Sequence, residues 1–278
     1  LHLPSPGNQG GRLGMKAAEG IRVDEVSMAY GSSKILDGVS LSIGKGSVIT
    51  MVGPNGCGKT TLLKIINNLL KPDRGRVFVE GREVNSMPAH RLARIMGYVP
   101  QGHKISFPFK VRDVVITGRM PYIPAFSSPK REDLEKTEQV LALTGISGLA
   151  DQPYTQISGG ERQLVMIARA MAQQPSVLLL DEPTSYLDFK NQILTLKMIK
   201  EISRSRKVTV IMTLHDPNHA LMFSDEVVLL RKLNGSRAGN VIAFGSPHEV
   251  ITPKNIQAAY GVEVEIVEVK GRKLLLPL

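Results

Sequence analysis

Residues 53–61 have the residue types and spacing of a phosphate-binding loop. They contain the pattern G-x-x-x-x-G-K-T, between an apolar run at 47–52 and a largely apolar segment at 62–70. Glycines in this pattern let backbone N–H groups turn toward an anion, and the following helix adds its positive end. A glycine-rich turn without a ligand would match the four fixed positions in roughly 1% of chains this long. We therefore predict nucleoside triphosphate binding by Gly53, Asn55, Gly56, Cys57, Gly58, Lys59, Thr60 and Thr61.

Two adjacent carboxylates supply a second set of chemical groups. Asp181 and Glu182 directly follow the apolar run 176–180. Lys59 is predicted to contact the terminal phosphates, while Thr60 and Asp181 are predicted to hold Mg²⁺. Glu182 would take a proton from the attacking water, a contribution of about 10²–10⁴ in rate. A surface carboxylate is the competing interpretation of Glu182, and its position next to the metal carboxylate favours catalysis.

Two further segments could bind phosphate. His215 follows the apolar run 208–213, where a lone histidine is usually structural. Beside a triphosphate, its imidazole could donate a hydrogen bond to the γ-phosphate. Ser158, Gly159 and Gly160 precede a predicted helix at 159–173, so they could form a second anion site at its N-terminus. Two half-sites in one chain predict a composite site formed by two copies.

Composition limits the class of protein. The chain has 278 residues, of which 42% are hydrophobic, and a formal net charge of +10. Because Cys57 is the single cysteine, no internal disulfide can form, which favours a reducing compartment. No apolar run reaches the roughly 20 residues that a membrane-spanning helix needs. The positive charge suits nucleotide or an anionic membrane surface. We expect no nucleic-acid partner, because tryptophan is absent and no run of aromatic residues could stack on bases.

Apolar runs that alternate with helical patterns predict an α/β fold with a parallel-centred sheet and an antiparallel part at the front. Predicted strands begin near residue 23 and continue at 36–43, 76–80, 97–100, 176–180, 208–213, 226–231 and 241–244, with a terminal hairpin at 262–276. Predicted core helices cover 58–70, 188–204 and 216–223. Patterns at 111–117, 130–143 and 159–173 are helical. We expect a disordered segment at 1–20 and one domain at 21–278, with an α/β core at 21–101 and 176–278 and a helical subdomain at 102–175.

Together these motifs resemble the ATP-binding subunits of ABC transporters, in order and in spacing. The matching segments are 53–61, 98–101, 158–160, 180–183, 185–188 and His215. The resemblance implies a P-loop NTPase core with a mixed sheet, an antiparallel β part and an inserted α-helical subdomain. It implies that Tyr30 stacks on adenine and that Gln101 contacts Mg²⁺ and relays the nucleotide state to a membrane partner. Two copies would close head to tail on two ATP molecules.

The resemblance also implies partners and a location. The partners would be a second copy, polytopic permease subunits and, indirectly, a solute-binding protein, at the cytoplasmic face of the membrane. Residues 111–122 and 259–264 resemble importers of iron chelates, haem and cobalamin, with molybdate or tungstate import as the alternative. A soluble ABC ATPase acting on nucleic acid is a further alternative, but such chains carry two cassettes or a long coiled coil. The signature departs from the usual pattern at Ile157, normally leucine, and at Glu161, normally glutamine.

Overall fold

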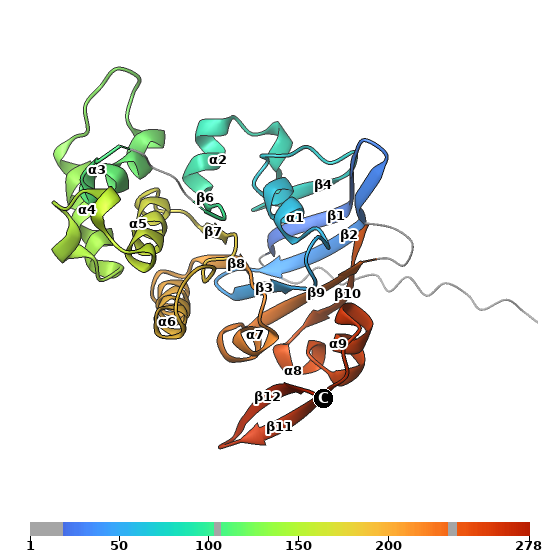
Figure 1. Cartoon of the computed structure of the whole chain (residues 1–278). Helices are drawn as coiled ribbons and strands as arrows, with labels where there is room; N and C mark the ends of the chain where they lie inside the picture. The colour runs from blue at the N-terminus through green and yellow to red at the C-terminus, as the bar shows by residue number, and fades with distance from the viewer. Residues whose placement is uncertain (1–18, 103–106, 233–237) are drawn as a thin grey trace, which may run out of the picture.

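The structure is a computed structural model, which describes residues 19–102, 107–232 and 238–278. Its main feature is a mixed sheet of ten strands in the order β5-β4-β1-β2-β10-β9-β3-β8-β7-β6 (Figure 1). The strands are β1 (Glu19–Tyr30), β2 (Ser33–Gly44), β3 (Val48–Val52), β4 (Arg74–Val79), β5 (Arg82–Glu83), β6 (Met96–Val99), β7 (Val177–Leu180), β8 (Thr209–Thr213), β9 (Glu226–Lys232) and β10 (Gly239–Gly245). The predicted fold class is confirmed by this sheet, which combines a parallel centre with an antiparallel part.

The parallel centre consists of β9, β3, β8, β7 and β6. Every residue of β3, β7 and β8 is buried, as expected for parallel strands covered on both faces. In β3, Val48 and Val52 pack into one hydrophobic cluster, whereas Ile49 and Met51 pack into the other. The first cluster includes α5 (Gly159–Ala172) and α6 (Phe189–Arg206), and the second includes α1 (Lys59–Ile66). Both faces of the central strands are therefore fixed by packed helices.

The antiparallel part comprises β5, β4, β1 and β2. It joins the centre through β10, which pairs in parallel with β2 and antiparallel with β9. The hairpin between β9 and β10 is confirmed, although its predicted turn at 234–235 lies outside the described residues. Ile35 and Leu36, near the start of β2, lie against Gly58 at the start of α1.

Only helices and turns, with one isolated bridge, occur in the described residues between β6 and β7. They include α3 (Val111–Ile116), a 3₁₀ segment at Thr117–Tyr122, α4 (Arg131–Leu143) and α5, which lie together at the left of Figure 1. Arg119 is 2% exposed; it donates from Nε to Asp133 Oδ1 at 3.0 Å and from Nη1 to the carbonyl of Ala172 at 2.8 Å. Arg119 therefore joins the 3₁₀ segment to α4 by a buried ion pair and to the end of α5 by a hydrogen bond.

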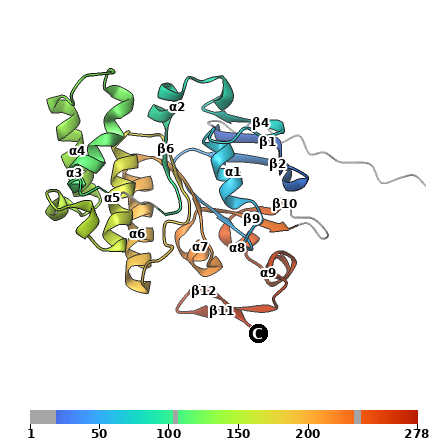
Figure 2. The same cartoon turned by 45° about the horizontal axis from the view of Figure 1, so that its top comes forward.

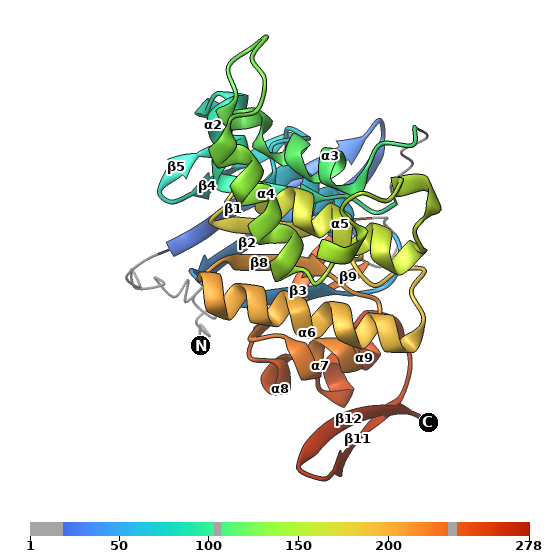
Figure 3. The same cartoon turned by 90° about the vertical axis from the view of Figure 1, so that its left-hand side faces the viewer.

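The C-terminal part begins with α7 (Pro217–Phe223), which has Asp216 as its N-cap, as predicted. It continues with α8 (Pro247–Val250), α9 (Pro253–Tyr260) and a hairpin of β11 (Val264–Val269) and β12 (Arg272–Pro277). The hairpin is a separate sheet at the bottom of Figure 3, where α6 runs across the front of the molecule. Figure 2 shows α1 and α6 on opposite sides of the central strands.

Some predicted boundaries were wrong. The first strand begins at Glu19, so the structured part starts two residues before the predicted position 21. Helix α1 ends at Ile66 instead of residue 70, because Asn68 adopts a left-handed conformation with φ 57°. Helix α2 (Ala89–Ile95) was not predicted. Residues 1–18 lie outside the described residues, and no helix in the described part is long and apolar enough to cross a membrane.

Candidate nucleotide-binding site

The candidate residues gather where four neighbouring parallel strands end. β3 leads into the phosphate loop, β6 leads to Gln101, β7 leads to Asp181 and Glu182, and β8 leads to His215. Carboxyl ends of parallel strands meet at one edge of a sheet, which is where ligands bind in open α/β folds. The strand order therefore unites motifs that are far apart in the sequence.

The phosphate loop needs its glycines for space and for backbone conformation. Gly53 has φ 154°, and a Cβ there would lie 2.5 Å from the carbonyl oxygen of Leu230. Gly58 has φ 93°, and a Cβ there would lie 2.6 Å from a methyl group of Leu36 on β2. Lys59 is 6% exposed, and its ammonium donates to the carbonyls of Gly53 at 2.7 Å and Pro54 at 3.2 Å. The ammonium is thus held over the loop by neutral acceptors, which an anionic phosphate can replace.

Asp181 forms the buried centre of a hydroxyl network. Its Oδ1 accepts hydrogen bonds from the hydroxyls of Thr60 and Thr213, both at 2.9 Å. The backbone N–H of Glu182 donates to the Thr213 hydroxyl at 2.8 Å. Asp181 is 1% exposed, so these contacts fix its carboxylate at the start of α1. Sequence reasoning missed Thr213, because a threonine at a strand end carries no distinguishing signal.

The carboxylate of Glu182 accepts hydrogen bonds from two side chains and contacts a third. Its Oε2 faces Gln101 Nε2 at 2.5 Å and Ser185 Oγ at 2.7 Å, and its Oε1 faces His215 Nε2 at 2.6 Å. Glu182 has φ 50°, a left-handed conformation that is rare for a non-glycine residue. The structure therefore brings three predicted site residues, Gln101, Glu182 and His215, into direct contact. Ser185 belongs to the matching segment 185–188, and the turn after β7 brings its hydroxyl to Glu182.

Cys57 contributes its backbone to the loop while its thiol points into the protein. The side chain is fully buried, and a Cβ on Gly53 would lie 2.8 Å from its sulfur. Burial raises the pKa of the thiol. The hydroxyl of Tyr260, at the end of α9, is also buried, and burial raises its pKa. The thiol therefore forms part of the floor beneath the loop.

The second predicted half-site lies at the N-terminus of α5. Ser158 is the N-cap, and its hydroxyl accepts a hydrogen bond from the N–H of Glu161 at 3.3 Å. In return, Glu161 Oε2 accepts from the N–H and the hydroxyl of Ser158, at 2.8 and 2.7 Å. These hydrogen bonds hold the pKa of Glu161 below its usual range. A carboxylate of the chain thus bonds with the hydroxyl that was predicted to bind phosphate.

Two sets of predicted residues lie apart from this cluster. Tyr30 ends β1 and is 52% exposed. Within the described ranges, no hydrogen bond or ring contact joins Tyr30, Ser158, Gly159 or Gly160 to the phosphate loop. Their roles in binding nucleotide stay predictions, as do the phosphate contacts of Asn55, Gly56 and Thr61.

The chain is similar to known proteins over most of its length. The family model described as ABC transporter matches residues 36–185. An uncharacterised ABC transporter ATP-binding protein of Methanocaldococcus jannaschii is 40% identical over 93% of this chain and 98% of its own length. The ferric enterobactin transport ATP-binding protein of Escherichia coli is 33% identical over 93% of this chain and 94% of its own length.

A solved structure, described as a metal-chelate type ABC transporter in an inward-facing conformation, has a TM-score of 0.80 to this chain. It is 29% identical, and the match covers 94% of this chain and 98% of that chain. The family model spans more than half of the present sequence, and the relatives match over nearly their full lengths. The chain belongs to the ATP-binding proteins of the ABC transporter family.

Proposed function

We propose that this chain is the ATP-hydrolysing subunit of a membrane importer, with an iron chelate, haem or cobalamin as the class of cargo. The contacts of the Glu182 carboxylate with Gln101 and His215 are the observation that carries the proposal. They hold a carboxylate, an amide and an imidazole near the carboxyl end of β3, the strand that leads into the phosphate loop. The similarity to a ferric enterobactin transport protein supports the cargo class.

The residues of the cluster would divide the work of hydrolysis. Lys59 would move from the carbonyls of Gly53 and Pro54 to the terminal phosphates. Glu182 would exchange one of its three contacting side chains for the attacking water and accept a proton from it. His215 would then donate to the γ-phosphate from the position where it now contacts Glu182.

The residues at this edge suit a hard cation that is held largely by phosphates. Mg²⁺ typically binds one or two carboxylates together with substrate phosphates and water. Thr60 and Asp181 offer a hydroxyl and a carboxylate 2.9 Å apart, and Gln101 adds an amide oxygen from the neighbouring strand end. We propose that these oxygens would hold Mg²⁺, which would supply positive charge that neutralises the phosphates.

A second copy of the chain would complete each site. Ser158 caps α5, and Gly159 and Gly160 are its first residues. This helix belongs to the helices and turns between β6 and β7, which we call the helical region (Figure 1). Because the N–H groups of these three residues make no contact with the phosphate loop of the same chain, we propose that they bind ATP on a second copy. The helical region would then transmit closure of this dimer to permease subunits at the cytoplasmic membrane surface.

The test is reconstitution of the chain with the membrane subunits that co-purify with it in detergent. Vesicles that contain the complex should take up a ferric siderophore, haem or cobalamin only when MgATP is supplied on the side of the ATPase subunit. A Glu182→Gln complex should bind ATP without supporting uptake. Uptake that is independent of ATP would contradict the proposed function, and uptake of molybdate alone would contradict the cargo class.

A further inference from the structure

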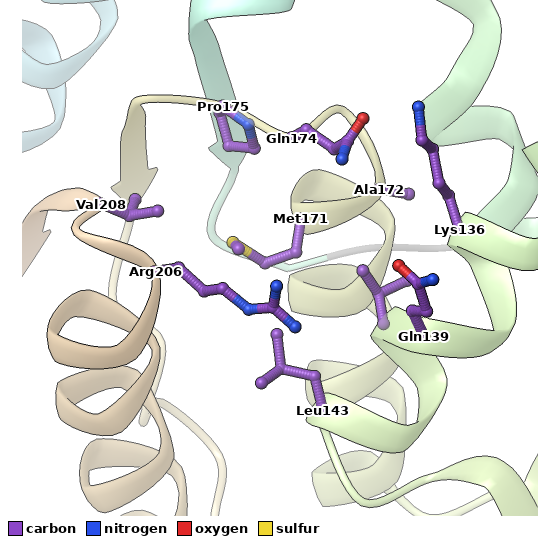
Figure 4. Close-up of a pocket in the computed structure, with 10 residues that line it drawn as sticks. Lys136, Gln139, Leu143, Met171, Ala172, Gln174, Pro175, Arg206 and Val208 are labelled. Carbon is purple, nitrogen blue, oxygen red and sulfur yellow. The ribbon is translucent and has the colours of Figure 1, made fainter.

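A cavity of about 220 Å³ lies where the helical region meets the core of the chain. It is bounded by α4, by the end of α5 with its connector to β7, and by the end of α6 with the start of β8 (Figure 4). We call it the seam pocket. It is separate from the nucleotide-binding site, because it lies at the C-terminal end of α5 whereas Ser158 lies at the N-terminal end.

Buried apolar side chains lie beneath the seam pocket. Val140, Met171, Ala172 and Val208 line it, and each is at most 8% exposed. Leu143 adds a partly buried side chain from α4. These side chains come from different elements, so this floor spans the seam between the helical region and the core. A hydrocarbon group placed on it would lose contact with water.

One cation reaches into this space. Arg206 extends from the last turn of α6 until its guanidinium lies between Met171, Leu143 and Gln139 (Figure 4). Within residues 19–102, 107–232 and 238–278, no hydrogen bond or ion pair involves its side chain. The other cation of the lining, Lys136, pairs with Glu132 and points away from Arg206 in Figure 4.

The polar groups of the rim complement an anion. No acidic side chain lines the seam pocket in the described part of the chain. Gln139 and Gln174 contribute amides, and the amide oxygen of Gln174 accepts from Arg119 Nη1 at 3.2 Å, which leaves its NH₂ group as a donor. A guanidinium matches a carboxylate particularly well, because its planar N–H groups can bind both oxygens at once.

We propose that the seam pocket binds a small aliphatic carboxylate, with its carboxylate on Arg206 and its alkyl chain on the apolar floor. The volume of the cavity corresponds to roughly seven water molecules at about 30 Å³ each, which is enough for a chain of about six carbons. Each methylene that is fully buried would strengthen binding by at most about fourfold, until the cavity is filled. A preference for medium chain length is therefore expected.

Occupancy of the seam pocket would regulate the ATPase, a consequence that rests on the proposed function. α4 and α5 belong to the helical region that carries Ser158, whereas α6 and β8 belong to the core. A ligand that contacts both the helical region and the core stabilises the present position of one relative to the other. It would therefore oppose any rearrangement of α5 that pairing of two copies on ATP requires.

The binding test uses the full chain without nucleotide, with hexanoate as the probe and hexanol and acetate as controls. Titration calorimetry should give saturable hexanoate binding, with a Kd on the order of 1 mM. Hexanol and acetate should each bind at least about tenfold more weakly, because hexanol lacks the carboxylate and acetate lacks the alkyl chain. Butanoate should bind more weakly than hexanoate, and decanoate should gain little over it.

A matched pair of variants assigns the site. Arg206→Gln should weaken hexanoate binding about tenfold, whereas Arg204→Gln, on the same exposed helix turn but outside the lining, should change it less than about twofold. Equal melting temperatures for both variants and the native chain would show that both are folded. Absence of saturable binding, equal binding of hexanoate and hexanol, or equal effects of the two variants would overturn the proposal.

Regulation has its own readout. Hexanoate should reduce ATP-dependent dimer formation in the native chain and have about tenfold less effect on Arg206→Gln at the same concentration. Binding of hexanoate without any effect on dimer formation would overturn the regulatory role. Because binding is measured without nucleotide, a failure of the proposed ATPase function would leave that result unchanged and would be recognised separately.

Discussion

Replacement of Glu182 by glutamine tests the proposed chemistry most directly, because the structure predicts that the variant keeps its neighbours. The carboxylate accepts from Gln101 and Ser185 at Oε2 and faces His215 at Oε1. An amide can place its oxygen toward Gln101 and Ser185 and its NH₂ group toward His215. The imidazole can accept this hydrogen bond in its other neutral tautomer. The substitution should therefore remove the base without disrupting the cluster.

The expected magnitudes differ between stability and turnover. Loss of one optimal hydrogen bond would change the free energy of unfolding by about 0.5–1.5 kcal/mol, which corresponds to a few degrees in Tm. Loss of general-base catalysis should lower turnover about 10²–10⁴-fold, equivalent to about 2.7–5.4 kcal/mol in the activation barrier. The kinetic effect should therefore far exceed the effect on stability.

The assay is phosphate release by the complex with its membrane subunits, together with size-exclusion chromatography of the isolated chain in ATP. Glu182→Gln should bind ATP with nearly native affinity and should accumulate as a dimer, because ATP that is not hydrolysed keeps the composite sites closed. Glu201→Gln, an exposed carboxylate on α6, is the matched control and should behave like the native chain. Turnover of Glu182→Gln within tenfold of native would refute the assignment of Glu182 as the base.

Further variants test other parts of the site and the fold. Lys59→Ala should weaken MgATP binding at least about 100-fold in a fluorescent-nucleotide titration, since a buried charge pair is lost; micromolar affinity in this variant would contradict the phosphate-loop assignment. Glu161→Gln keeps a capping residue but removes the charge beside Ser158, so ATP-driven dimerisation should strengthen about two- to fivefold per site; unchanged or weaker dimerisation would show that the carboxylate does not compete with phosphate. Burial raises the pKa of Cys57, so its alkylation at mildly alkaline pH should be on the order of 100-fold slower in the folded chain than in denaturant; rapid labelling that ATP prevents would instead place the thiol in the nucleotide site. Asp133→Ala should lower the free energy of unfolding near neutral pH by about 3–5 kcal/mol in urea titrations, because Arg119 is left buried without its partner. Burial alone would raise the pKa of Asp133, but the N–H of Lys130 and the guanidinium of Arg119 hold it below its usual value. This stabilisation is thus present above the unfolded pKa of about 4 and is lost as the pH falls through the lower folded pKa; a difference between native and variant that grows in acid would contradict the ion-pair reasoning.

Local patterns determined much of the fold. The buried strands β3, β7 and β8 were predictable because parallel strands covered on both faces are continuous apolar runs. The start of α7 was predictable because an Asp side chain can accept a hydrogen bond from a free N–H group of the first turn, and because proline is favoured at the first helical position. The end of α1 was not predictable, because the left-handed conformation of Asn68 depends on the path of the chain from this helix to β4.

The sequence by itself determined which groups carry the chemistry: the phosphate loop, the paired carboxylates Asp181 and Glu182, and the helix start at Ser158. These signals are local, because a loop that surrounds phosphate needs its glycines and its lysine at fixed spacing. Only the tertiary structure decided that Gln101 and His215 share the carboxylate of Glu182, that the Cys57 thiol faces inward, and that Arg206 enters a cavity between the helical region and the core. Such contacts join residues from different elements, and their partners are set by strand order and helix packing, which residue spacing along the chain does not encode.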